Sequence, residues 1–144
     1  MIEHSPDFTA PDAALLALRP SLASSATSTE PAGTVGHFLH HTLRPVLKLQ
    51  NLVLLTTIAD FLHDHHIPFR AASVTEQQRL LAELLTRNTK LRYTLVGLVA
   101  GLFTSTELAF YRLHRPELNR RLLELAVRRA QDQTAFLTTL LPSL

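Results

Sequence analysis

Apolar residues recur three or four positions apart along most of the chain after residue 34, which is the spacing of one face of an α-helix. The clearest stripe consists of Leu80, Leu81, Leu84 and Leu85, within an otherwise polar stretch. No stretch alternates apolar and polar residues as a half-buried strand does, and no Asn-Gly or Asp-Gly pair marks a hairpin. The pattern therefore predicts an all-α fold.

Capping and breaking residues divide this pattern into helices. The first helix is expected from about Val35 towards His66. It contains Pro45, which cannot extend the preceding helical turn, so a kink or break is expected there. Ser73 and Thr104 are each followed three positions later by a glutamate, the pattern of a capping box that opens a helix.

Two further helices complete the expected bundle. Asn88 either starts a new helix, over about 89–102, or interrupts a longer one. Pro116 suits the first turn of a last helix, which is expected to end near Thr139. We therefore expect a five- or six-helix bundle with a Pro-kinked first helix and short connections.

Residues 1–33 differ from the rest of the chain because they are rich in Pro, Ser, Thr and Ala. They have little apolar surface to bury, so we expect a flexible tail followed by a helical domain over residues 34–144. A short apolar patch from Ala13 to Leu18 interrupts the tail. It either docks on the body as a helical turn or stays frayed, and we favour the second alternative because termini usually fray.

Composition excludes several classes of protein. The 144 residues include no cysteine, which rules out disulfides, a thiolate nucleophile and Cys-ligated metals. The first residues do not resemble a secretory signal, and the longest apolar run, residues 93–103, is short of the roughly 20 residues that a membrane-spanning helix needs. We expect a cytoplasmic protein without a membrane span.

Charge is unevenly distributed. Residues 1–34 carry a net charge of −3, whereas the remainder holds 13 basic and 8 acidic residues, a net charge of +5 that favours acidic partners. On the last helix, Glu117 is spaced to pair with Arg121 and Glu124 with Arg128, as on a solvated helix face. The arginines left over as candidate interaction residues are Arg115, Arg120 and Arg129.

Gly97 and Gly101 lie four residues apart in an apolar helix. Each weakens the helix, but together they remove side chains from one strip and let another backbone approach. The same spacing mediates helix dimerisation in membranes. We expect a tight crossing with another helix of the same chain, and a seam between two copies is the alternative.

Five histidines are candidate metal ligands. His37 and His41 are spaced to present two imidazoles on one helix face, and His63, His65 and His66 cluster at a helix end. A helix C-terminus also favours imidazolium, which explains the second group without a metal. Because no nucleophile elbow or Gly-rich phosphate loop is present, we expect no catalytic site and no metal or other cofactor.

A family resemblance covers about residues 40–133. It rests on Leu43–Asn51, on Gly97–Gly101 followed by Phe103 and Thr104, on Glu107, Leu108 and Tyr111, on Leu118–Arg121 and on Arg129–Gln133. In these residues the chain resembles a small all-α bacterial family whose members are sometimes labelled "glyoxalase". The resemblance implies a shared fold and leaves the function open. Metal-dependent glyoxalase I resembles a βαβββ fold with His and Glu ligands, whereas no strand is predicted here, so that activity is disfavoured.

These observations favour a non-enzymatic helical interaction or regulatory protein that binds a protein partner or a second copy of itself. The alternative is an accessory protein that contacts RNA or a ribonucleoprotein through its basic body. An enzyme of glyoxalase type is the third hypothesis.

Overall fold

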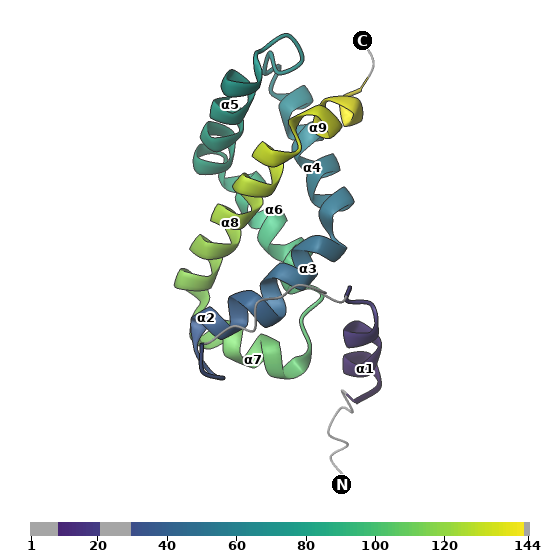
Figure 1. Ribbon diagram of the computed structural model, residues 1–144, viewed down its shortest axis with the longest axis vertical. Coiled ribbons are helices and arrows are strands. Elements are labelled where there is room, and N and C mark those ends of the chain that lie inside the picture. Colours follow the sequence, from purple (N-terminus) through teal and green to yellow (C-terminus); the bar gives the residue numbers. More distant parts are fainter. Residues whose placement is uncertain (1–8, 21–29, 143–144) are drawn as a thin grey trace, which may run out of the picture.

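The computed structural model describes residues 9–20 and 30–142. These residues form helices joined by short connections and contain no strand, which confirms the all-α prediction (Figure 1). The elements in chain order are α1 (Thr9–Ala17), α2 (Val35–Phe38), the π-helical turn η1 (Leu39–Leu43), α3 (Arg44–Leu49), α4 (Asn51–Asp64), α5 (Val74–Arg87), α6 (Thr89–Ala100), α7 (Ser105–Leu113), α8 (Arg115–Asp132) and α9 (Thr134–Leu140).

The expected number of five or six helices is too low, because two expected helices are divided at glutamines. The first bends by 66° at Gln50, whose side chain donates to the Leu98 carbonyl oxygen at 3.1 Å. The last ends at Asp132, and Gln133 separates α8 from α9 while its side chain bonds to Asn51. Both breaks coincide with long-range side-chain hydrogen bonds, which local sequence patterns do not reveal.

The kink expected at Pro45 is not confirmed. Pro45 is buried in the first turn of α3, directly after the widened turn η1. This is the place where a missing backbone N–H is tolerated best. The sharp bend lies five residues later, at Gln50.

The predicted helix starts are confirmed by hydrogen bonds at their N-caps. Ser73 Oγ accepts from the Glu76 N–H at 3.2 Å, and Thr104 with Glu107 forms a complete capping box. Asn88 ends α5 and caps α6, accepting from the Leu91 N–H at 2.8 Å. Of the two alternatives for this residue, the start of a new helix is therefore the one observed.

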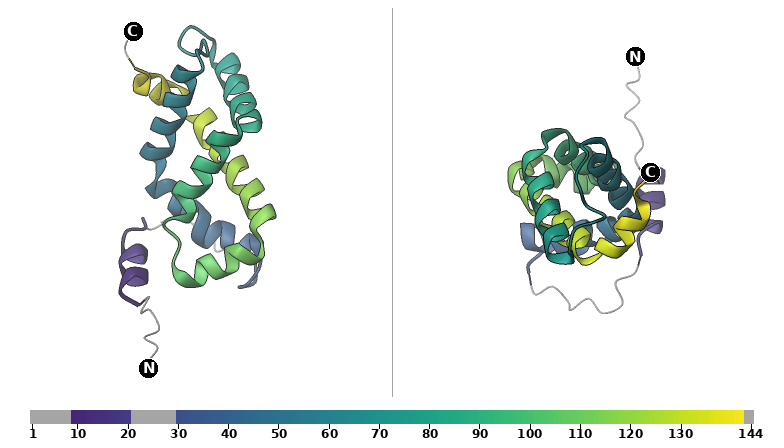
Figure 2. Two further views of the ribbon diagram at one scale, coloured as in Figure 1. Left: turned by 180° about the vertical axis from the view of Figure 1, so that it is seen from behind. Right: turned by 90° about the horizontal axis from the view of Figure 1, so that it is seen from above.

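The core lies between α4, α5, α6 and α8, which run along the length of the molecule (Figures 1 and 2). α5 packs against α8 and α6, and α4 packs against α6 and α9. The segment from α2 to α3 and helix α7 close one end, while the α4–α5 turn and α9 form the other (Figure 1). Burial of each large apolar side chain contributes roughly 1.5–3 kcal/mol. Those that are almost fully buried include Leu47, Leu55, Ile58, Leu62, Phe69, Leu81, Leu91, Leu95, Leu118, Leu122 and Leu137.

Helix α1 lies beside the end of the molecule that contains α7 (Figures 1 and 2). Asp12 accepts hydrogen bonds from the Ser105 N–H at 2.8 Å and from its hydroxyl at 2.5 Å. Arg19 forms an ion pair with Glu107, while Leu16 and Leu18 remain 54% and 58% exposed. The apolar patch is thus part of a helix that docks through polar contacts, and not the frayed segment that the sequence analysis favours. Residues 1–8 and 21–29, on which the expected flexibility of the tail depends, lie outside the described residues.

Within the described ranges, no single helix has the length and apolar character needed to cross a bilayer. Only Val35–Leu49 and Asn51–Asp64 taken together meet both criteria, and these two segments are bent by 66° from each other.

Candidate binding cleft

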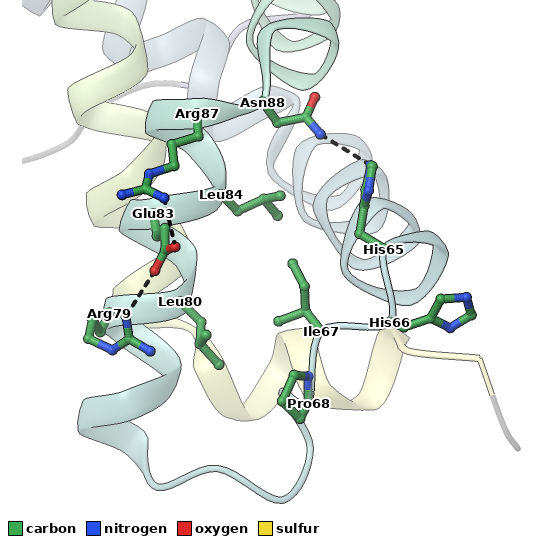
Figure 3. Close-up of a pocket in the computed structure, with 10 residues that line it drawn as sticks. All are labelled: His65, His66, Ile67, Pro68, Arg79, Leu80, Glu83, Leu84, Arg87 and Asn88. Atoms are coloured by element: carbon green, nitrogen blue, oxygen red, sulfur yellow. Dashed lines mark hydrogen bonds and ion pairs between the residues drawn. The ribbon is translucent and has the colours of Figure 1, made fainter.

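A rigid turn after α4 forms one wall of a cleft. His66 adopts a left-handed conformation with φ of 54°, and its N–H bonds to the His63 carbonyl at 3.0 Å. The Ile67 N–H bonds to the Leu62 carbonyl, also at 3.0 Å. This pair of bonds is the Schellman motif, which usually has glycine in the left-handed position. The motif reverses the chain so that Ile67 faces α5 (Figure 3).

The turn is anchored on its far side by a buried aromatic residue. Phe69 is 1% exposed, and its carbonyl oxygen accepts from Gln77 Nε2 on α5 at 3.0 Å. The Gln77 side chain is itself buried. The segment between His66 and Phe69 is therefore fixed at both ends.

Two hollows lie on either side of this turn, and they share His66, Ile67 and Pro68 as a ridge. The first, about 460 Å³, lies between the ridge and α5, and Leu80, Leu84 and Ile67 point into it (Figure 3). The second, about 410 Å³, lies towards the C-terminal end of the described chain and is lined by Leu62, His63, Phe69, Arg70, Ala71, Leu141 and Pro142 in addition to the ridge.

The rim of the first hollow is polar on both sides. On α5, Glu83 accepts from Arg79 at 2.8 Å and pairs with Arg87 at 3.4 Å. Opposite them, His65 Nε2 and Asn88 Nδ2 lie 3.1 Å apart (Figure 3). The hydrogen bonds that Arg79 donates to Glu76 and Glu83 raise its pKa.

The candidate histidines fall at both ends of the molecule. His65 and His66 border the first hollow, and His63 and His66 border the second. His37 and His41 stack on each other with ring centroids 4.0 Å apart. Over residues 9–20 and 30–142, no three His, Asp or Glu side chains are grouped so that they could hold a metal ion.

The tight internal crossing expected at Gly97 and Gly101 is wrong. Both residues are exposed, and a Cβ added to Gly97 would have no heavy atom within 4 Å. A Cβ on Gly101 would meet only the Gly97 carbonyl oxygen, at 3.0 Å. The glycine strip faces outward because α6 packs on α4, α5 and α8 through its leucines and valines. A seam between two copies stays a prediction.

The ion pairs observed along α8 also differ from those expected from the sequence. Arg120, expected to be left over, pairs with Glu124 at 2.9 Å. Arg115 lies over the Tyr111 ring, with its guanidinium carbon 5.7 Å from the centroid. Within the part of the chain that is described, Arg121, Arg128 and Arg129 have no carboxylate within 4.0 Å. Arg128 is exposed, where ion pairs between neighbouring side chains are weak. Arg121 is half-buried instead, and its Nε has no hydrogen-bond partner in the described structure.

Glu107 has a larger role than its capping box indicates. Besides the Thr104 N–H at 2.8 Å, it accepts from the Thr42 hydroxyl at 2.8 Å and from Arg19. Burial opposes ionisation of Glu107, but Arg19 and these hydrogen bonds outweigh it and hold its pKa below the ordinary value. Sequence patterns carry no signal for the pairing with Arg19, 88 residues away.

Comparison of the chain with protein-family profiles, with curated proteins and with solved structures finds no match. The resemblance of residues 40–133 to a family labelled "glyoxalase" therefore stays a prediction.

Proposed function

We propose that this protein is a non-enzymatic helical interaction module, and that it binds an acidic segment of a protein partner through two apolar anchor side chains. The observation that carries the proposal is the fixed ridge of His66, Ile67 and Pro68 with an apolar hollow on each side.

The dimensions of the hollows support this proposal. Volumes of about 460 and 410 Å³ fall in the range of roughly 300–1,000 Å³ found for binding pockets. Each hollow has room for a large apolar side chain, and such anchors supply most of the free energy of binding in protein interfaces. Because the ridge is held by the Schellman motif and by Phe69, little order has to be gained on binding.

The arginines around the hollows are the groups that an acidic partner would contact. On the rim, Arg79 pairs with both Glu76 and Glu83, whereas Arg87 shares only Glu83 and is 79% exposed. Arg70, in the second hollow, makes one long hydrogen bond to the Leu141 carbonyl oxygen, at 3.4 Å. Exposed ion pairs contribute little to stability, so carboxylates of a partner can replace them at small cost.

Selection from a display library of random peptides tests the proposal, because it requires no identified partner. The full chain should enrich peptides with two apolar residues flanked by Asp or Glu. Arg87→Glu should weaken binding of the selected peptides at least tenfold, because it reverses a rim charge without affecting buried residues. Leu80→Asp, on the floor of the first hollow, should abolish binding.

Leu113→Asp is the matched control, because Leu113 is 80% exposed on α7, at the other end of the molecule. It should bind the selected peptides as the unmodified chain does. Enrichment without acidic residues, or equal binding by all variants, would contradict the proposal. Sedimentation of the chain alone reveals whether a second copy occupies the cleft, in which case Leu80→Asp should produce monomers.

A further inference from the structure

His37 and His41 form a pair of stacked imidazole rings at the end of the molecule opposite to the cleft (Figure 1). The ring centroids are 4.0 Å apart, and the ring planes differ by 26°. His41 is exposed and His37 is half-buried, so an ion has access to the pair from solvent. An ion that binds two imidazole nitrogens at about 2.0–2.1 Å accepts them up to about 4 Å apart. The separation of the two rings therefore matches that of two ligands on one ion.

Pro45 explains why the two rings are in line. It lacks an N–H, and its ring crowds the carbonyl group four residues earlier, which belongs to His41. The helix widens there into the π-helical turn η1, in which the Arg44 N–H bonds to the carbonyl of Leu39, five residues back. In an α-helix, residues four apart are offset by about 40° around the axis, and a wider turn reduces this offset. Single π-helical turns inside a helix often mark functional sites.

A carboxylate lies beside the histidine pair. The Glu30 side chain packs against the backbone of Gly36, where its Oε2 would be 2.9 Å from an added Cβ. Gly36 directly precedes His37, so the negative charge of Glu30 favours a cation at this place. Arg44 is the nearest cation along the chain, and it is exposed to solvent, where its charge is screened.

We propose that His37 and His41 form a binding site for a divalent transition-metal ion, each through one ring nitrogen. Imidazole is a ligand of Zn²⁺, Cu²⁺ and Ni²⁺, whereas Mg²⁺ and Ca²⁺ take oxygen ligands. Among the described residues, no third His, Asp or Glu is grouped with the pair to complete a metal site. Two positions of a tetrahedral ion are therefore left for water or for a side chain of another molecule. The site is independent of the proposed peptide binding, because the cleft lies at the other end of the molecule (Figure 1).

Calorimetric titration of the full chain with Zn²⁺ tests the site. The unmodified chain should bind one equivalent. His37→Gln and His41→Gln should each weaken binding at least tenfold, and replacing both should weaken it little further, because chelation requires both rings. His40→Gln is the matched control, since it removes an imidazole from the same turn outside the stacked pair. It should bind Zn²⁺ as the unmodified chain does, and so should His63→Gln, at the far end of α4.

Electron paramagnetic resonance with one equivalent of Cu²⁺ provides a second measurement, which does not depend on the folding of any variant. The spectrum of the unmodified chain should show coupling to two imidazole nitrogens. A spectrum without this coupling would overturn the proposal. The same conclusion would follow if the unmodified chain did not bind Zn²⁺, if His37→Gln bound it equally well, or if His63→Gln lost it instead.

Discussion

At the scale of single residues, His66 links the local backbone to the proposed site. It occupies the left-handed position of a Schellman motif, where glycine is the usual residue and a side chain is strained. Residues held in such positions often serve function rather than stability. The sequence pattern makes His66 a metal candidate, whereas the structure gives it a place in the ridge between the two hollows.

Replacing His66 by glycine should therefore raise the free energy of unfolding by about 1 kcal/mol, because the strain of the left-handed backbone is removed. Denaturant titration measures this effect. His65→Gly is the matched control, since His65 has an ordinary φ of −93°, and it should not stabilise the protein. A loss of stability in His66→Gly would show that the turn is not held as described.

Glu107 should make stability depend on pH. Its pKa in the folded protein lies below the ordinary value of 4.5, so folding favours the ionised form. This contribution is fully present above about pH 4.5 and is lost as the pH falls through the lower folded pKa. Glu107→Gln should show a shallower loss of stability below pH 4.5, whereas the exposed Glu117→Gln should follow the unmodified chain. Equal slopes for all three would contradict the ion pair with Arg19.

At the scale of helices, sequence signals that act within one turn predict the structure well. The capping residues Ser73 and Thr104 start helices where expected, because their hydrogen bonds are local. The breaks at Gln50 and Gln133 are not predictable in this way, because those side chains bond to residues far away in the chain. The direction of the Gly97 strip is not predictable either, since spacing alone does not show which face of a helix is covered.

Alanine substitutions in α6 test directly whether the Gly97 strip faces outward. Gly97→Ala should raise the free energy of unfolding by about 0.5–1 kcal/mol, because the added Cβ meets no heavy atom within 4 Å and alanine favours the helix. Gly101→Ala, whose Cβ would meet the Gly97 carbonyl at 3.0 Å, should gain less. Destabilisation by Gly97→Ala that depends on protein concentration would instead reveal a seam between two copies.

Helix α1 is tethered by the hydrogen bonds of Asp12 with Ser105 and by the ion pair of Arg19 with Glu107. Arg19 and Glu107 are 9% and 16% exposed, so Arg19→Ala leaves a partly buried carboxylate without its cation. We expect a loss of roughly 2–4 kcal/mol in the free energy of unfolding, with earlier proteolysis within residues 9–20. Arg92→Ala, at an exposed site, should leave both measurements unchanged. An equally stable Arg19→Ala chain would mean that the ion pair with Glu107 does not form in solution.

At the scale of the whole molecule, the cleft joins residues that the sequence keeps apart. The histidines at the end of α4 are visible in the sequence as a cluster, and the leucine stripe of α5 as a buried face. These histidines and leucines lie together around Ile67 and Pro68 because the chain reverses at His66. The sequence does not indicate this reversal, since the left-handed position is occupied by a histidine and not by a glycine. The fold class is therefore predictable from periodicity, whereas the cleft requires the tertiary structure.

A titration of the isotopically labelled full chain with a selected acidic peptide, monitored through its backbone amide resonances, tests most directly whether the cleft binds such a segment. We expect saturable shifts concentrated at residues 65–71 and 79–88, which border the two hollows and the α5 rim. Helices α3 and α7 should keep their resonance positions. Shifts centred on α7 or on the exposed face of α6, with residues 65–71 unchanged, would contradict this expectation.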